Sequence, residues 1–418
     1  MKKSLLVTLL LAIVLPAFSE DYQAKTIGSL GGGHAIATAI NSSGQLVGWG
    51  KNQSKAIHAF LKSPKNAIQD LGTLPGMTSS VATGISDSAQ VVGCSSDANG
   101  NHVFSWTAAR GMEDLGPIAY VTGSCVVSVN NVGQVVWSSE PGSHIFRWTH
   151  SGGTHDLGGP VIAYATNASS QIVGEIVVNG MRHTVLWSHS SGFQDLGTLN
   201  GWTNSEGFAI NENGDVAGLS YPTTVPPEDG FLWTANQGML GIGFSSLGTV
   251  KSLNNHQQIT GWFTGSNTLH PFVWSENAGI RDLIDELPAT LRDDPHFWLA
   301  EGINDAGQIV VSEFPSPHAN PFILTPKMNV SLASSVNPSQ VGQAITFTAS
   351  VASVQGPPPD GEKIMFKDNT RTIGTAILNK GTAVVTVSNL KAGTHPITAT
   401  YVGDVNYRVA SPLLSARW

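Results

Sequence analysis

The chain has 418 residues, of which only 12% are charged, and it contains 46 glycines and 11 tryptophans. Its formal net charge is −8 and it has no basic run, which argues against a nucleic-acid partner. The low charge and frequent aromatics exclude a disordered chain, and the glycine content excludes a long coiled coil.

The N-terminus has the pattern of a secretory signal peptide. Lys2 and Lys3 precede an apolar run over residues 5–15, and Ala17 and Ser19 place small residues before a cut at Glu20. We therefore expect residues 1–19 to be removed, which takes the net charge from −8 to −10. No later apolar stretch reaches about 18 residues, so we expect no membrane span and an extracellular or cell-surface location, with the periplasm as the alternative.

Sevenfold internal repetition dominates residues 20–326. A GQLVG-like segment recurs at intervals of about 43 residues and is followed by runs resembling HAFLK and DLG. The anchor positions of the seven units are Gln45, Gln90, Gln134, Gln171, Asp215, Gln258 and Gln308.

Each unit predicts four short antiparallel strands, so the fold class is all-β, and the repetition favours a seven-bladed β-propeller over a solenoid. The last unit ends at its third run, PFILTP (321–326), without a DLG. The missing run occurs at the N-terminus as TIGSL (26–30), so the first strand is expected to complete the last blade.

A histidine on the third strand precedes an aspartate on the fourth by twelve residues in five units. The two residues are kept or lost together, which predicts a structural pair within each blade, although a metal or acid/base site per blade is the alternative. The pairs are His58 with Asp70, His102 with Asp114, His144 with Asp156, His183 with Asp195, and His270 with Asp282.

With motifs such as His58-Ala59-Phe60, the repeats resemble the extracellular HAF-repeat family over about 300 residues. The resemblance implies secretion and a propeller-like fold. It implies no established chemistry, so no catalytic residue is assigned from it.

Loop length varies only between the second and third strands and between successive units, which places the variation on one face of the propeller. Binding residues concentrate on variable loops carried by a rigid scaffold. The longest such loop, 283–301, supplies the ligand-binding candidates Asp293, Asp294, His296 and Trp298, and a second loop begins at Tyr221. Packing against an inner strand is the alternative reading of Trp298.

Residues 327–418 show a different pattern of alternating strands separated by turn signals, which predicts an Ig-like β-sandwich. The segments at 334–351 and 400–407 resemble bacterial Ig-like domains, which implies a spacer or adhesive unit. The short run after Tyr407 leaves open whether the natural chain continues past Trp418.

Cys94 and Cys125 are the two cysteines, and export permits a disulfide between them, with free thiols as the alternative. Asp97, Asn99 and Asn101 alternate as in a calcium loop but lack its closing glutamate. We therefore expect no metal and no cofactor.

Two functions remain from the sequence. The first is a non-catalytic, monomeric extracellular interaction or adhesion protein, whose propeller presents a loop face to a protein or glycan and whose Ig-like domain forms a stalk. The second is a propeller hydrolase or lyase acting on extracellular polysaccharide. A purely architectural envelope component is a further alternative.

Overall fold

The computed structural model describes residues 21–118, 125–138, 144–159, 161–199, 201–223, 228–243, 247–265, 268–288, 297–314, 320–353, 357–358, 360–401 and 413–417. Residues 1–19, the predicted signal peptide, lie outside these ranges. Within them the chain is all-β, apart from the short 3-10 helix η1 (Ile284–Glu286).

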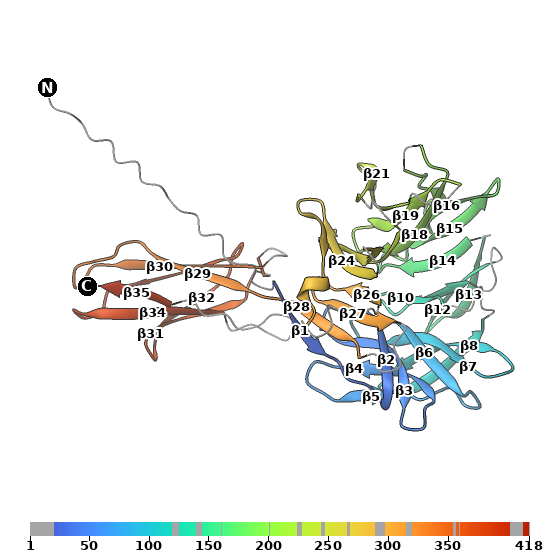
Figure 1. Ribbon diagram of the computed structural model, residues 1–418, viewed down its shortest axis with the longest axis horizontal. Coiled ribbons are helices and arrows are strands. Elements are labelled where there is room, and N and C mark those ends of the chain that lie inside the picture. Colours follow the sequence, from blue (N-terminus) through green and yellow to red (C-terminus); the bar gives the residue numbers. More distant parts are fainter. Residues whose placement is uncertain are drawn as a thin grey trace.

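The described residues before 327 form seven four-stranded antiparallel sheets, which are the blades of a β-propeller arranged around a common axis (Figure 1). Within a blade the strands follow chain order from the axis outward. Blades 1 to 3 are β2 (Gly31–Ile40), β3 (Leu46–Asn52), β4 (Ile57–Lys62), β5 (Ile68–Asp70); β6 (Ser79–Ile85), β7 (Val91–Ser96), β8 (Asn101–Thr107), β9 (Gly111–Pro117); and β10 (Val127–Val129), β11 (Val135–Ser138), β12 (Ile145–Thr149), β13 (Gly153–Gly158). Blades 4 to 6 are β14 (Val161–Thr166), β15 (Ile172–Val178), β16 (Met181–Ser188), β17 (Gly192–Asp195); β18 (Asn204–Ile210), β19 (Val216–Tyr221), β20 (Asp229–Thr234), β21 (Gly238–Gly241); and β22 (Gly248–Leu253), β23 (Ile259–Thr264), β24 (Leu269–Ser275), β25 (Gly279–Asp282).

The seventh blade joins the two ends of the repeat region. It consists of β26 (Phe297–Ile303), β27 (Ile309–Phe314), β28 (Phe322–Pro326) and β1 (Tyr22–Thr26), and β1 pairs antiparallel with β28 from Tyr22↔Pro326 to Thr26↔Phe322. The N-terminal strand thus closes the last blade, as the sequence predicts.

Blades pack through large side chains at a repeated position of the third strand. The five tryptophans there are only 4–8% exposed: Trp106, Trp148, Trp187, Trp233 and Trp274. Each therefore belongs to the core between blades, where an aromatic ring buries the most apolar area.

The turn between the first two strands of each blade lies on one face of the propeller, which we call the hairpin face. Six buried asparagines in these turns donate from the side-chain amide to the backbone carbonyl of the equivalent residue in the next blade, at 2.7–3.1 Å. The bond from Asn304 to Asn41 crosses the closure between blades 7 and 1. We call these residues the asparagine ring: Asn41, Asn130, Asn167, Asn211, Asn254 and Asn304. Ser86 holds the equivalent position in blade 2.

We expect Asn254→Ala to lower the free energy of unfolding by about 1–3 kcal/mol, because buried backbone groups lose their partners. The amide of Asn254 donates to Asn304, and its carbonyl oxygen accepts from the backbone N–H of His256 and Gln258. Chemical denaturation followed by tryptophan fluorescence measures the effect. The matched control is His256→Ala in the same turn, where the side chain is exposed; an equal loss in both variants would contradict a role for the ring.

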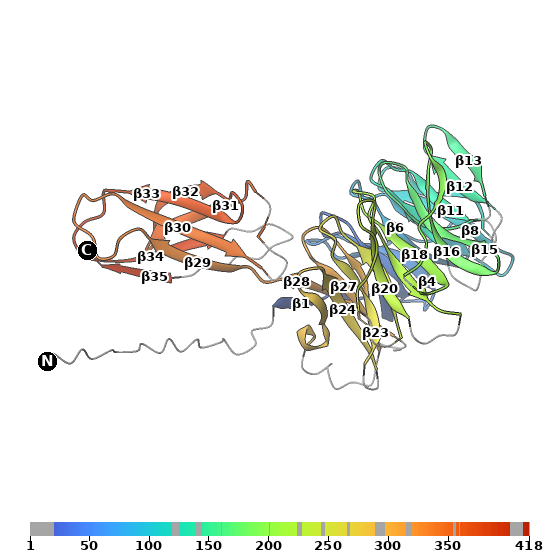
Figure 2. The ribbon, with the colours of Figure 1, turned by 90° about the horizontal axis from the view of Figure 1, so that it is seen from above.

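After residue 326 the chain forms a β-sandwich, whose two sheets lie beside the propeller next to β1 and β28 (Figures 1 and 2). One sheet is β29 (Asn329–Ser334), β30 (Ile345–Ala352) and β33 (Thr382–Val387). The other is β32 (Arg371–Ile377), β31 (Lys363–Asp368), β34 (Thr394–Tyr401) and β35 (Leu413–Arg417). Phe347, Phe366 and Tyr401 are fully buried between them. Because β28 and β1 both reach the hairpin face at Pro326 and Tyr22, the sandwich joins the propeller on that side.

Candidate functional site

The five His–Asp pairs lie on the outer strands of their blades. In each, Nδ1 of the histidine is 2.5–2.8 Å from an aspartate oxygen. Each aspartate also accepts a backbone N–H two residues on, for example Asp70 from Gly72 and Asp156 from Gly158. Hydrogen bonds from His144 and Gly158 lower the pKa of Asp156. The pairs are separated around the rim, and the described residues hold no group of three or more potential metal ligands. This geometry fits a structural pair in each blade.

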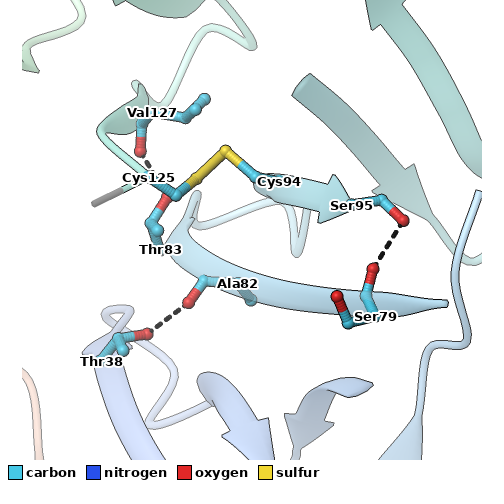
Figure 3. The surroundings of a disulfide bond; sticks show 8 residues. All are labelled: Thr38, Ser79, Ala82, Thr83, Cys94, Ser95, Cys125 and Val127. Atoms are coloured by element: carbon cyan, nitrogen blue, oxygen red, sulfur yellow. Dashed lines mark hydrogen bonds between the residues drawn. A yellow bond between two sulfur atoms is a disulfide. The ribbon is translucent and has the colours of Figure 1, made fainter. Parts of the chain in front are cut away.

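A disulfide joins Cys94, on β7 of blade 2, to Cys125, which precedes β10 of blade 3 (Figure 3). The Cα atoms are 6.0 Å apart, within the usual range for a disulfide. Hydrogen bonds between neighbouring blades lie close by in Figure 3: Thr38 donates to the carbonyl of Ala82, and Thr83 to that of Val127.

The ligand-binding candidates from the variable loops differ in where the structure places them. Asp293, Asp294 and His296 lie outside the described residues. Trp298 is wrong as a ligand-binding candidate, because β26 begins at Phe297 and places Trp298 in the core with 1% exposure. Its ring packs edge-on against Phe322, with the centroids 5.9 Å apart.

Tyr221 ends β19 on the face opposite the hairpins, which we call the loop face, and belongs to a polar cluster between blades 4 and 5. Its hydroxyl donates to Glu206 Oε1 at 2.5 Å. Arg182 donates to Glu175 and lies 3.6 Å from Glu206. Glu175 is 2% exposed, and burial, reinforced by the charge of Glu206, raises its pKa to about 7. Glu175 is therefore partly protonated near neutral pH, the kind of carboxyl that marks a functional region.

The channel along the propeller axis is lined by residues that β-bulges turn inward. In six blades the pairing of the first and second strands skips one residue, at positions 38, 83, 164, 208, 251 and 301. All six line the channel. A bulge leaves its extra residue out of the ladder and redirects the side chain. We call these residues the bulge ring: Thr38, Thr83, Tyr164, Phe208, Lys251 and Glu301.

Glycines on the second strand accommodate the bulges. A Cβ at Gly48 would lie 1.9 Å from the carbonyl oxygen of Ile36, and one at Gly93 would lie 2.0 Å from that of Val81. Only glycine allows this close backbone approach. The final glycine of the GQLVG motif thus accompanies the bulge in five of the six blades, and Val311 holds this position in blade 7.

A cavity of about 300 Å³ extends from the bulge ring towards the asparagine ring, and its walls differ around the axis. Tyr164 and Phe208 form an aromatic pair, with centroids 5.2 Å apart at 80°. In the next two blades, Lys251 of blade 6 and Glu301 of blade 7 form an ion pair at 3.5 Å. A second cavity of about 170 Å³ continues to the hairpin face, where Asp87, Glu212 and Asp305 line it.

Sequence reasoning missed the bulge ring and the Glu175–Arg182 contact. The ring could have been found, because each member lies three residues before the asparagine-ring position, as Tyr164 precedes Asn167 and Glu301 precedes Asn304. The polar cluster gives no such signal, since its members come from several strands of two blades.

Comparison with known proteins identifies the C-terminal module. Residues 332–414 match the bacterial Ig-like domain (group 3) family, so this part of the chain is a bacterial Ig-like domain. No curated protein matches the chain.

Several solved structures are similar to this chain. A virginiamycin B lyase from Staphylococcus aureus has 12% identity and a TM-score of 0.48, covering 73% of this chain and 98% of its own. The β-propeller domain of the Trilobed protease from Pyrococcus furiosus has 10% identity and a TM-score of 0.47, covering 69% and 93%. The extracellular domain of a one-component system protein from B. thetaiotaomicron has 11% identity and a TM-score of 0.46, covering 92% and 53%. At these identities the likeness concerns the fold alone.

The described part of the chain contains no helix long and apolar enough to cross a membrane.

Proposed function

We propose that this protein is an exported, non-catalytic binding protein whose propeller receives its ligand in the axial channel. The Ig-like domain then serves as the stalk. The bulge ring is the observation that carries this proposal. Tryptophans, His–Asp pairs and turn asparagines recur from blade to blade, whereas the bulge ring holds Thr, Tyr, Phe, Lys and Glu at one depth. A scaffold that repeats its structural residues and varies its channel residues fits selective binding.

Export is supported by the sequence pattern of residues 1–19, the resemblance of the repeats to the extracellular HAF-repeat family, and the disulfide. Disulfides persist in oxidising compartments and are rare in the cytosol. The sandwich joins the propeller on the hairpin side, which leaves the loop face for a partner.

Binding by the full chain to a panel of extracellular polysaccharides and peptides tests the proposal. The double variant Lys251→Met, Glu301→Gln removes both members of the ion pair together, so that no unpaired charge remains in the channel. We expect at least tenfold weaker binding than for the unmodified chain. The control His102→Ala, on the outer rim, should bind normally. Equal binding by the channel variant would overturn the channel as the site, and release of products from a bound polymer would overturn the non-catalytic assignment.

A hydrolase or lyase acting on extracellular polysaccharide is the second candidate. Glu175 favours it, because a carboxyl with a pKa of about 7 beside a second carboxylate can act as a general acid. Burial and the bond to Arg182 restrict access of a substrate to Glu175, so binding remains the better account.

A further inference from the structure

If the channel binds a ligand, as proposed above, the chemistry of its walls indicates the class of that ligand. We infer that the cavity beside the bulge ring binds a neutral carbohydrate, with one pyranose unit of a glycan entering the channel. Three properties of the cavity lead to this: an aromatic wall, an adjacent ion pair, and negative charge at the hairpin end.

The aromatic wall suits a sugar ring. The C–H groups on one face of a pyranose carry partial positive charge and pack against the electron-rich face of an aromatic ring. Tyr164 and Phe208 meet edge to face, so they expose ring surface in two orientations. The phenol end of Tyr164 faces the cluster of Glu175, Glu206 and Arg182, and burial raises the pKa of Tyr164, so it stays protonated. The wall is therefore apolar on its ring, and its phenol end is engaged with Glu175.

The ion pair suits hydroxyl groups. Lys251 offers donors and Glu301 offers acceptors 3.5 Å away, and a vicinal diol presents both functions at similar spacing. Hydrogen bonds to charged groups are stronger than those between neutral groups. The two charges cancel, so the pair itself does not select a charged ligand. In the next two blades around the axis, blades 1 and 2, Thr38 and Thr83 already donate to backbone carbonyls, which fixes that wall.

Negative charge at the hairpin end of the channel disfavours anions. Asp87, Glu212 and Asp305 line the cavity at the hairpin face, and each accepts a hydrogen bond from a backbone N–H of the preceding blade. Towards the loop face, Arg182 lies between Glu206 and the partly protonated Glu175, so this end carries little net charge and the negative potential comes from the hairpin end. A phosphate or a uronate would meet this potential along the channel, whereas a neutral sugar would not.

Isothermal titration of the full chain with four tetrasaccharides tests the inference. The probes are β-1,4-linked glucose, β-1,4-linked N-acetylglucosamine, its deacetylated cationic form, and anionic galacturonic acid. We expect at least one neutral tetramer to bind, and the galacturonic acid tetramer to bind at least tenfold more weakly.

Phe208→Ala should weaken binding of the neutral tetramer at least tenfold, and Phe208→Leu should weaken it as well, because it keeps an apolar side chain but removes the aromatic ring. The matched control is Phe193→Ala on the outer strand β17, where the ring is 39% exposed and binding should be unchanged. Circular dichroism of each variant verifies that it is folded.

Each outcome bears on the inference or on the proposed function. Binding of the cationic or anionic tetramer in preference to both neutral ones, with the same loss in Phe208→Ala, would overturn the neutral sugar and keep the channel as the site. If a neutral tetramer binds Phe208→Ala as tightly as the unmodified chain, both the neutral-sugar inference and the channel as the binding site would be overturned. Absence of binding by both neutral tetramers would overturn the carbohydrate inference, while the channel remains testable with the wider panel.

Discussion

Trp298→Ala is expected to lower the free energy of unfolding by about 3–5 kcal/mol, the range for removing a large aromatic side chain from a core. Trp298 is 1% exposed and lies in a cluster with Tyr22, Leu283 and Leu324. These side chains come from β1, from the segment before η1 and from β28, so the cluster holds the closing blade together. The loss should therefore weaken the seam at which the two ends of the propeller meet.

Denaturation followed by tryptophan fluorescence measures this effect in the propeller, because all tryptophans except Trp418 lie before residue 327. Trp298→Phe is the matched variant. It keeps an aromatic ring and removes the indole N–H, which is buried and has no hydrogen-bond partner among the described residues, so it should cost less than Trp298→Ala. Tetrasaccharide binding by folded Trp298→Ala should be close to normal. A specific loss of binding with unchanged stability would restore Trp298 as a ligand residue.

Removal of the disulfide is expected to cost about 3–4 kcal/mol of unfolding free energy. The bond closes a loop with a sequence separation of 31 residues, and the chain-entropy treatment of a loop of that size gives this magnitude. The double variant Cys94→Ala, Cys125→Ala avoids a free thiol. Its unfolding midpoint in denaturant is compared with that of the unmodified chain.

The reducing agent supplies the control for this prediction. Reduction should destabilise the unmodified chain by the same amount as the double substitution, and it should leave the double variant unchanged. Intact mass with and without alkylation counts the free thiols before each measurement. Two alkylated cysteines in protein exported under oxidising conditions would contradict the disulfide.

The fold could be predicted from the sequence because its signals are local and repeated. The GQLVG-like run that follows each hairpin turn recurs in all seven units, so the strands of one blade predict those of the others. Even the strand that closes the ring could be assigned, since residues 26–30 repeat the pattern of residues 70–74.

The candidate site could be predicted only in part, because it depends on geometry between blades. Trp298 follows a long loop in the sequence, and only the start of β26 at Phe297 shows that its side chain enters the core. The contact of Arg182 with Glu206 crosses from blade 4 to blade 5. No spacing within one repeat encodes that contact. The bulges were not predicted from the sequence either. An extra residue in one strand changes the side-chain alternation but hardly changes the repeat length.

The pairing of β1 with β28 also sets the order in which the propeller can be completed. The partners Tyr22 and Pro326 are separated by 304 positions in the chain (326 minus 22), so β1 is synthesised long before the strand with which it pairs. At roughly 5–20 residues per second, ribosomal synthesis of the intervening chain takes about 15–60 s. During that time β1 lacks its partner strand β28, and each completed blade lacks the next blade against which it packs. A protein with this topology gains from translocation before folding, because the ring can then close in the compartment where it is used.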